Sequence, residues 1–209
     1  MRIAAIIPVG TLEGAKTRLA VTLDAEERHD LVEDLLARTV ASALAVARLD
    51  DVLVVSPDPE VLTRAAAIGA RTLRQRTKGL NAGLTEARAD VIAGGAEAIL
   101  VLPIDLPFVT AEAVSAVLEP LSEPSAADTG GHVVLVTDRH GTGTNALALR
   151  PPEVIDFAFG PGSRGRHRAA AEAAKAVYTE VGGLLTVDLD TPEDLVFVEA
   201  AEAERLGVG

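Results

Sequence analysis

The chain has 209 residues, of which 48% are hydrophobic and 24% are charged, which is ordinary for one well-packed globular domain and argues against disorder. It contains no cysteine, which excludes disulfides and thiolate metal sites, and no apolar run of membrane-spanning length, so we expect a soluble cytoplasmic protein. A formal net charge of −12 argues against nucleic acid as a partner, because a phosphate backbone calls for a basic surface, but a few local cations could still hold a small phosphorylated ligand.

Apolar runs of strand length alternate with amphipathic runs of helix length. The predicted strands cover residues 2–9, 51–56, 70–75, 97–107, 132–138, 144–149 and 184–190. The predicted helices cover residues 25–47, 59–69, 81–95, 110–121, 163–176 and 191–207. Strands that alternate with helices predict an α/β sandwich of three layers with a mostly parallel sheet. Because no linker divides the chain, we expect residues 1–209 to form a single domain, with 121–131 as a surface loop.

Residues at the helix ends support these assignments. Asp24, Asn81 and Thr110 are predicted N-caps, and Gly69 is predicted to end a helix. The apolar face predicted for helix 25–47 consists of Leu31, Leu35, Val40 and Leu44.

Ligands of such sheets bind beyond the carboxyl ends of the strands, so residues that follow strands are candidates for a site. Asp105 follows the most strand-like run and lies near Pro103 and Pro107, which restrict the backbone and would aim its carboxylate at the ligand. The alternative is that Asp105 only stabilises a turn.

Two more carboxylates follow in "VDLDTPEDL". A helix N-terminus accounts for residues 190–194, but it leaves Asp188 unexplained. On a strand, Asp188 and Asp190 would point to the same side and repel each other unless a cation joined them. Together with Asp105 they would offer Mg²⁺ the oxygen ligands that it prefers.

Two further groups of residues carry weaker signals. Lys16 and Arg18 lie in a loop after the first strand, where they suit phosphate neutralisation. A solvated surface residue is the default interpretation of Lys16 considered alone, and the P-loop spacing is absent. Two glycine-containing loops, 140–145 and 160–163, enclose a short strand and could bind an anion or be plain surface turns. His140 and His167 flank these loops, and the four histidines show no zinc-binding spacing.

Six segments in this order resemble one family: "IIPV…AKTRLA", "KGLNAGL", "VLPIDLP", "GTGTNAL", "FAFGPGS…H" and "VDLDTPEDL". Over nearly its whole length the chain resembles the 2-phospho-L-lactate guanylyltransferases, also called phosphoenolpyruvate guanylyltransferases, of coenzyme F420 biosynthesis. The resemblance implies a single domain of the nucleotide-diphospho-sugar transferase (glycosyltransferase-A-like) type. It also implies Mg²⁺ as cofactor and transfer of GMP from GTP to a three-carbon phospho-acid, with release of pyrophosphate. It leaves open which phospho-acid is used and whether the chain forms a homodimer.

The same resemblance implies roles for individual residues. The Mg²⁺ ligands would be Asp105, Asp188 and Asp190, and the substrate's phosphate and carboxylate would be held by Thr144, Gly160 and Ser163. Lys16 and Arg18 would act in catalysis at the GTP phosphates, and Asp105 would act in catalysis by binding the metal. Asn81 would bind the nucleoside. Gly10 stands where family members commonly have lysine, which would leave more of the triphosphate charge to Arg18.

Three other interpretations are compatible with parts of the sequence. A molybdopterin-type guanylyltransferase would normally carry a "GG" turn after the first strand, which is absent here. "DLDT" matches the nucleophile motif of haloacid-dehalogenase-like phosphatases, but there it belongs after the first strand rather than near the end of the chain. A nucleotide-binding module without catalytic activity is the third interpretation, and it would bind GTP without releasing pyrophosphate.

Overall fold

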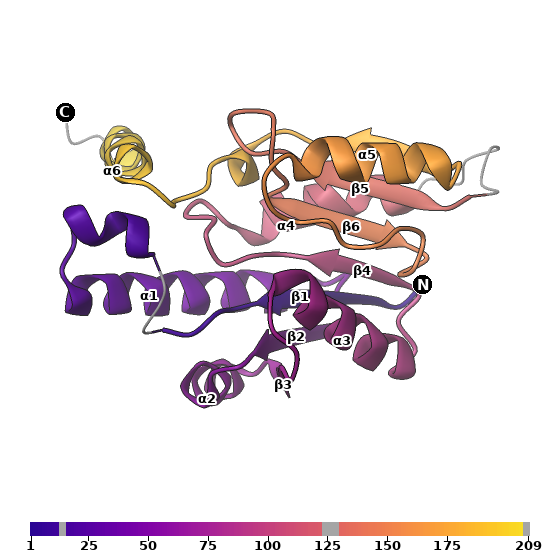
Figure 1. Ribbon diagram of the computed structural model, residues 1–209, viewed down its shortest axis with the longest axis horizontal. Coiled ribbons are helices and arrows are strands. Elements are labelled where there is room, and N and C mark those ends of the chain that lie inside the picture. The colour runs from indigo at the N-terminus through magenta and orange to yellow at the C-terminus, as the bar shows by residue number, and fades with distance from the viewer. Residues whose placement is uncertain (13–15, 123–129, 207–209) are drawn as a thin grey trace.

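The computed structural model of the chain describes residues 1–12, 16–122 and 130–206 (Figure 1). The predictions for residues 13–15, for most of the surface loop (123–129) and for residue 207 therefore lie outside the described residues. The strands are β1 Ile3–Pro8, β2 Asp51–Ser56, β3 Arg71–Arg74, β4 Ala98–Val101, β5 His132–Val136, β6 Ala146–Arg150 and β7 Val177–Glu180. The α-helices are α1 Ala25–Leu44, α2 Pro59–Ile68, α3 Leu80–Ala93, α4 Ala111–Leu118, α5 Ser163–Ala173 and α6 Pro192–Leu206. Short 3₁₀ helices are η1 Thr17–Val21, η2 Glu119–Ser122 and η3 Leu184–Thr186.

The strands form one sheet in the order β3-β2-β1-β4-β6-β5-β7. All neighbouring pairs are parallel except those of β6, which runs antiparallel to both β4 and β5. The beginning of β6 therefore lies at the same edge as the carboxyl ends of β1 and β4. The predicted mostly parallel sheet is confirmed.

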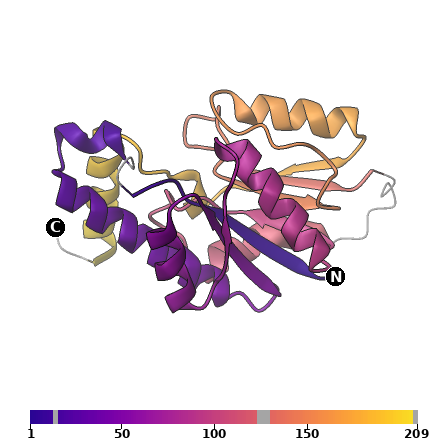
Figure 2. The ribbon, with the colours of Figure 1, turned by 60° about the horizontal axis from the view of Figure 1, so that its bottom comes forward.

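Helices cover both faces of the sheet, so the predicted three layers are confirmed. Ile3, Ala5 and Ile7 of β1 share one core with buried side chains of α1, α2 and α4. Ala4 and Ile6 point to the other face and share a second core with α3 and α5. Figure 2 shows α3 lying across this second face. Strands buried on both sides explain why the sequence shows continuous apolar runs instead of alternation.

Helix α6 lies away from the sheet, beside η1 and the first half of α1 (Figures 1 and 2). A small apolar cluster of Leu35, Phe108, Leu189 and Val198 attaches α6 to α1. Within the described ranges, no helix is both long enough and apolar enough to cross a bilayer. The assignment of residues 1–209 to one domain stays a prediction.

Most of the predicted helix ends are confirmed. The Asp24 carboxylate accepts hydrogen bonds from the backbone N–H groups of Glu26 and Glu27, and the Glu27 side chain completes a capping box. The hydroxyl of Thr110 caps α4, and Gly69 closes α2.

Two predictions about the helices are wrong in detail. The N-cap of α3 is Gly79, so Asn81 already lies inside the helix. The buried stripe of α1 consists of Val32, Leu35, Leu36, Thr39, Val40 and Ala43, whereas Leu44 is 43% exposed. The stripe follows the 3.6-residue period, and Leu31 and Leu44 lie at its margins.

The last predicted strand, 184–190, is wrong. Residues Leu184–Thr186 form η3, and the chain then continues in an extended but unpaired conformation. The sheet edge is taken by β7, which pairs in parallel with β5 and which the sequence patterning did not reveal. After β7 the chain leaves this edge at Gly182 and Gly183. Asp188 and Asp190 therefore lie near the end of β4 instead of on a strand.

Candidate active site

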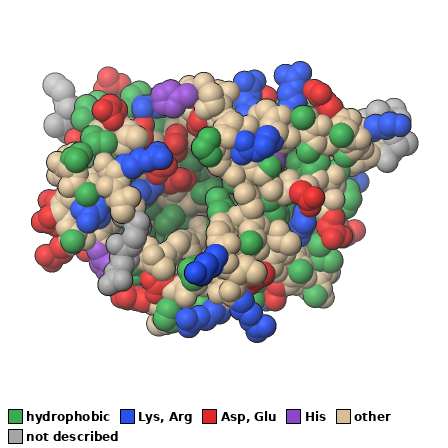
Figure 3. Space-filling view, in the orientation of Figure 1, with side chains coloured by type: hydrophobic (Ala, Val, Ile, Leu, Met, Phe, Trp, Pro, Cys, Tyr) green, Lys and Arg blue, Asp and Glu red, His purple; other side chains and the backbone are tan. Residues whose placement is uncertain are grey.

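Two adjoining cavities open at the edge of the sheet where β1 and β4 end and β6 begins. The first, of about 410 Å³, lies at the end of β1 and is lined by Gly10, Thr11 and Lys16. The second, of about 520 Å³, lies between the two glycine loops. Residues common to both linings are Leu80, Pro103, Asp105 and Asp190. The space-filling view shows a hollow in this region, with apolar side chains inside and charged groups at its rim (Figure 3).

Five aspartates line the second cavity, and one backbone hydrogen bond explains how three of them, Asp105, Asp188 and Asp190, come together. The N–H of Leu189 donates to the carbonyl oxygen of Asp105, with an N···O distance of 2.9 Å. The Leu189 side chain is buried, whereas Asp188 and Asp190 on either side of it line the cavity. The predicted meeting of Asp105, Asp188 and Asp190 thus results from an unpaired extended segment docked on the exit of β4.

The aspartates destabilise one another's charges. Burial raises the pKa of Asp105; nearby Lys16 opposes this rise, whereas Asp190 and Asp188 add to it. Burial also raises the pKa of Asp188, with further contributions from Asp190 and Asp194. The Lys16 ammonium lies 2.8 Å from Asp190 Oδ1 and forms an ion pair with that carboxylate. The site therefore holds more negative than positive charge.

Carboxylate oxygens are the ligand type that Mg²⁺ prefers, so the donor set fits this ion. The carboxylate oxygens of the three aspartates do not all lie within 4.8 Å of one another, so the three do not form a compact ligand set as they stand. Because Lys16 holds Asp190, direct coordination of one ion by all three carboxylates would require Asp190 to turn away from Lys16.

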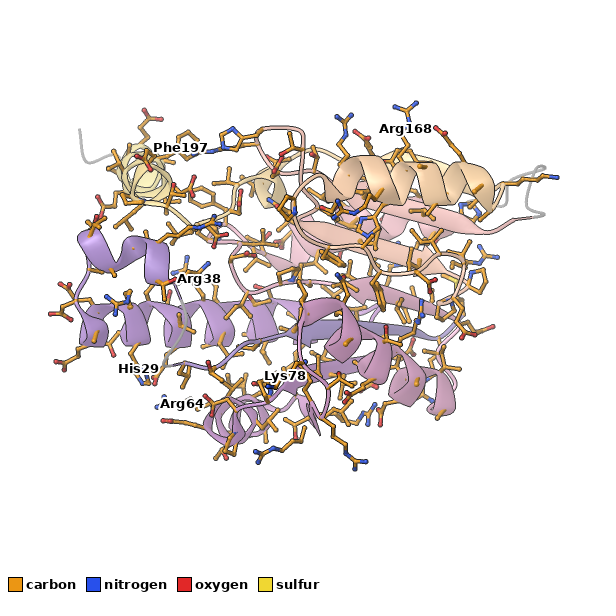
Figure 4. All side chains as sticks on the ribbon, in the orientation of Figure 1. His29, Arg38, Arg64, Lys78, Arg168 and Phe197 are labelled. Carbon is orange, nitrogen blue, oxygen red and sulfur yellow. The ribbon has the colours of Figure 1, made fainter. Side chains whose placement is uncertain are left out.

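A compact set of metal-type ligands does occur elsewhere in the described residues, formed by His29, Glu33 and Glu60 between α1 and α2. Arg64 forms ion pairs with both glutamates, and His29 contacts Glu33 (Figure 4). An ion-pair network between two helices accounts for this set without a metal.

The first glycine loop is built around Asp138. Its carboxylate accepts hydrogen bonds from the N–H groups of Thr142 and Gly143, both with N···O distances of 2.8 Å. A Cβ on residue 143 would lie 2.6 Å from Asp138 Oδ2, which explains the glycine. The N–H of Gly143 is therefore bonded to Asp138 and does not face a ligand.

The second glycine loop leads directly into α5. Gly160 has a φ of 116°, a conformation that favours glycine, and Gly162 precedes the helix without a side-chain cap. Ser163, the first residue of α5, is 1% exposed as a whole and lines the second cavity together with Thr144 and Gly160. The N-terminus of α5 adds a partial positive charge to this end of the cavity. The predicted anion-binding residues are thus brought together.

The remaining predicted residues lie around the cavities. Lys16 lines the first cavity, and exposed Arg18 on η1 lines the second. The side-chain amide of Asn81 donates to the Phe159 carbonyl (3.1 Å) and accepts from the Phe159 N–H (2.9 Å). Asn81 therefore holds the backbone just before Gly160, and a contact with a nucleoside would require one of these bonds to break.

Sequence reasoning missed two residues that support the aspartates. Asn145 is buried, donates to the Leu185 carbonyl and interacts with Asp188. Asp194, which the sequence explained as a first-turn residue of α6, accepts hydrogen bonds from the N–H groups of Asp190 and Thr191 and pairs with Arg139. A Thr-x-x-Asp capping pattern was the available signal for Asp194, and none was available for Asn145.

Burial acts to raise the pKa of Asp194, but these hydrogen bonds outweigh it, so the pKa is lowered and the group stays charged. The charged Asp194 thus holds the backbone N–H groups of Asp190 and Thr191 in place.

Comparison with known proteins agrees with this geometry. The model of a protein family described as CofC-like guanylyl transferases matches residues 3–200. A phosphoenolpyruvate guanylyltransferase from Rubrobacter xylanophilus is 45% identical over 202 residues, covering 96% of this chain and 95% of that protein. The enzyme of the same name from Sphaerobacter thermophilus is 43% identical over 197 residues, covering 93% and 91%.

The fold also recurs in solved structures. Glucosyl-3-phosphoglycerate synthase from Mycobacterium tuberculosis, in complex with Mg²⁺ and uridine diphosphate, superposes with a TM-score of 0.64 at 15% identity, covering 100% of this chain and 80% of that chain. This likeness confirms the predicted nucleotide-diphospho-sugar transferase type of fold. Together with the family match over nearly the whole chain, it leads to one conclusion: the chain belongs to the family of CofC-like guanylyl transferases.

Proposed function

We propose that this chain transfers GMP from GTP to phosphoenolpyruvate and releases pyrophosphate. The observation that carries the proposal is that Asp105 and Asp190 line both cavities. A nucleotide in the first cavity and an acceptor in the second would meet at these carboxylates. The names of the two curated relatives support phosphoenolpyruvate, rather than 2-phospho-L-lactate, as the acceptor.

The first cavity suits the donor's phosphates. Lys16 would leave Asp190 and neutralise a phosphate oxygen, and Arg18 lies where it can approach the same group from η1. Gly10 contributes backbone but no charge in this cavity. These two basic residues would therefore supply the positive charge of the protein at the triphosphate.

The second cavity suits a small acid with two anionic groups. Thr144 and Ser163 offer hydroxyl groups, and the backbone at Gly160 can approach a ligand closely because no side chain intervenes. The N-terminus of α5 favours an anion at this position. These hydroxyl groups, the open backbone and the helix N-terminus are the groups that a three-carbon phospho-acid requires.

The proposed reaction needs no general base. An anionic phosphate oxygen of the acceptor attacks the α-phosphorus of GTP; a new P–O bond forms as the bond from the α-phosphorus to the bridging oxygen breaks, and pyrophosphate leaves with the bonding electrons. No proton has to move. The main obstacle is repulsion between anions, which is about 4 kcal/mol for unit charges about 4 Å apart near a protein surface.

The protein therefore acts mainly by positioning and by charge. Lys16, Arg18 and the α5 N-terminus reduce the repulsion and align the two anions. Asp105, Asp188 and Asp190 would hold Mg²⁺, which when bound would cancel further negative charge on both reactants.

The test is incubation of the purified chain with GTP, MgCl₂ and one acid at a time: phosphoenolpyruvate, 2-phospho-L-lactate or 3-phospho-D-glycerate. Pyrophosphate release is followed and the product is identified by mass. We expect release with phosphoenolpyruvate and its loss when EDTA replaces MgCl₂. GTP binding without pyrophosphate release for any acid would contradict the proposal and indicate a non-catalytic module.

A further inference from the structure

His167 connects the two glycine loops. It lies on α5, is 0% exposed, and uses both ring nitrogens. Its Nδ1 lies 3.0 Å from the hydroxyl oxygen of Thr144, in the first loop. Its Nε2 accepts a hydrogen bond of 3.0 Å from the N–H of Ala158, next to the second loop. The ring of Phe159 packs edge-on against it at a centroid distance of 5.2 Å. The imidazole is therefore held in one orientation.

The partner of Nε2 determines where the ring proton lies. A backbone N–H can only donate, so Nε2 must be the unprotonated acceptor. A neutral imidazole then carries its proton on Nδ1 and donates it to Thr144. The Thr144 hydroxyl accepts this bond and keeps its own proton for another partner.

Other observations keep the ring neutral and leave the threonine proton facing the cavity. Burial, with a smaller contribution from the Arg166 charge, lowers the pKa of His167 to about 4. Within the part of the chain that the structure describes, His167 is the hydrogen-bond partner found for the Thr144 hydroxyl, and Thr144 lines the second cavity.

We infer that His167 is a positioning residue: it fixes the Thr144 hydroxyl as a hydrogen-bond donor toward an anionic oxygen of the acceptor, and it sets the spacing of the two loops. This inference rests on the proposed function, because it requires an anionic acceptor in the second cavity. It assigns to His167 a part in acceptor affinity without direct contact with the acceptor.

Two substitutions test the roles of the two ring nitrogens separately. Asparagine at 167 reaches the Nδ1 position and can still donate to Thr144, but it leaves the Ala158 N–H without its acceptor. Glutamine reaches the Nε2 position and can accept from Ala158, but it leaves Thr144 without its donor. We expect His167→Gln to raise the KM for phosphoenolpyruvate about 10- to 150-fold, the range for one hydrogen bond to a charged group, and to leave the KM for GTP unchanged. His167→Asn should lower the melting temperature while changing the acceptor KM much less.

A double-mutant cycle tests whether His167 acts through Thr144. Thr144→Val removes the hydroxyl at similar volume and should raise the acceptor KM as His167→Gln does, whereas Thr144→Ser should restore it. In the Thr144→Val background, His167→Gln should have no further effect on that KM. Arg168→Gln is the matched control on the same helix, because Arg168 points into solvent and forms an ion pair with Glu172 one turn away (Figure 4).

The outcomes are distinct. If wild-type protein releases no pyrophosphate with phosphoenolpyruvate, the proposed function fails and the inference fails with it. If wild-type protein is active, two results overturn the inference alone: effects of His167→Gln and Thr144→Val that multiply in the double variant, or a His167→Gln effect that is equal for GTP and acceptor. The inference is supported if both single variants raise the KM for phosphoenolpyruvate but not the KM for GTP, and if the double variant raises it no further.

Discussion

Asp105 lies half-buried beside two other carboxylates, so asparagine at this position would remove a charge that the folded chain holds unfavourably. The same change would remove a proposed Mg²⁺ ligand. We therefore expect Asp105→Asn to raise the thermal stability of the metal-free protein and to lower its turnover.

The size of the effect follows from the charges around the site. Burial is the largest cause that disfavours the Asp105 charge, and repulsion by Asp190 and Asp188 adds to it; at the effective dielectric near a protein surface, unit charges about 7 Å apart would repel by about 2 kcal/mol. Lys16 offsets roughly one of the two repulsions on Asp105, which leaves about 2 kcal/mol to be relieved. For a domain of this size, that corresponds to a rise of about 4 to 8 °C in melting temperature.

The assay is thermal unfolding in EDTA and in MgCl₂, combined with pyrophosphate release. Because the pKa of Asp105 is raised in the folded state, its ionisation lowers stability as pH rises through that pKa. The difference between variant and wild type should therefore be present at pH 7 and vanish below about pH 4, where the carboxyl is protonated in both the folded and the unfolded chain. Turnover should fall about 100-fold or more, and the stabilisation of wild type by MgCl₂ should be reduced.

Asp30→Asn, which removes an exposed carboxylate from α1, is the matched control and should change neither property. A lower melting temperature for Asp105→Asn in EDTA, or near-normal turnover with MgCl₂ and GTP, would refute the reasoning.

Three further changes test other parts of the site. Lys16→Met should lower kcat/KM for GTP about 10- to 100-fold in steady-state kinetics and leave Asp190 without its cation; an unchanged value would remove Lys16 from the site. Asp194→Ala should lower the melting temperature by about 5 to 10 °C at pH 7, because three hydrogen bonds and an ion pair are lost. Since the pKa of Asp194 is lowered in the folded state, this difference in melting temperature should shrink as pH falls below about 4. Equal stability of variant and wild type at pH 7 would contradict this role. Gly160→Ala should raise the acceptor KM, because alanine is strained at a φ of 116°. Gly165→Ala is the control within α5; a Cβ there meets no atom within 4 Å, so this variant should leave the acceptor KM unchanged. The same KM for both variants would show that the loop conformation is unimportant.

The sheet was largely predictable because its strands are buried on both sides, and such strands appear as continuous apolar runs wherever they occur. Strand β7 escaped prediction because it lies at an edge and is only half-buried, so its four residues "VYTE" show no strong pattern. The segment 184–190 was mistaken for a strand because its leucines and valine alternate with polar residues. In fact Leu185 and Leu189 are buried by docking against other parts of the core.

Residues of the site could be predicted where the local sequence restricts the backbone, as the prolines do around Asp105 and the glycines do before Ser163. Supporting contacts between distant segments could not. The bond from Leu189 to Asp105 joins residues far apart in the chain, and His167 acts through partners from two different loops. Asn81 was predicted to cap α3, but the N-cap is Gly79. The side-chain amide of Asn81 bonds the backbone of Phe159 instead.

Because β6 runs against its neighbours, the short hairpin from β5 to β6 delivers Thr144 to the same edge as the ends of β1 and β4. Among the described residues, this hairpin lines the cavity proposed for the acceptor, whereas Gly10, Thr11 and Lys16, which follow β1, line the cavity proposed for the donor. Insertions or exchanges in this hairpin would thus alter the choice of acid without shifting strand register or nucleotide preference. The two specificities of the enzyme can diversify independently, on a scaffold that stays the same.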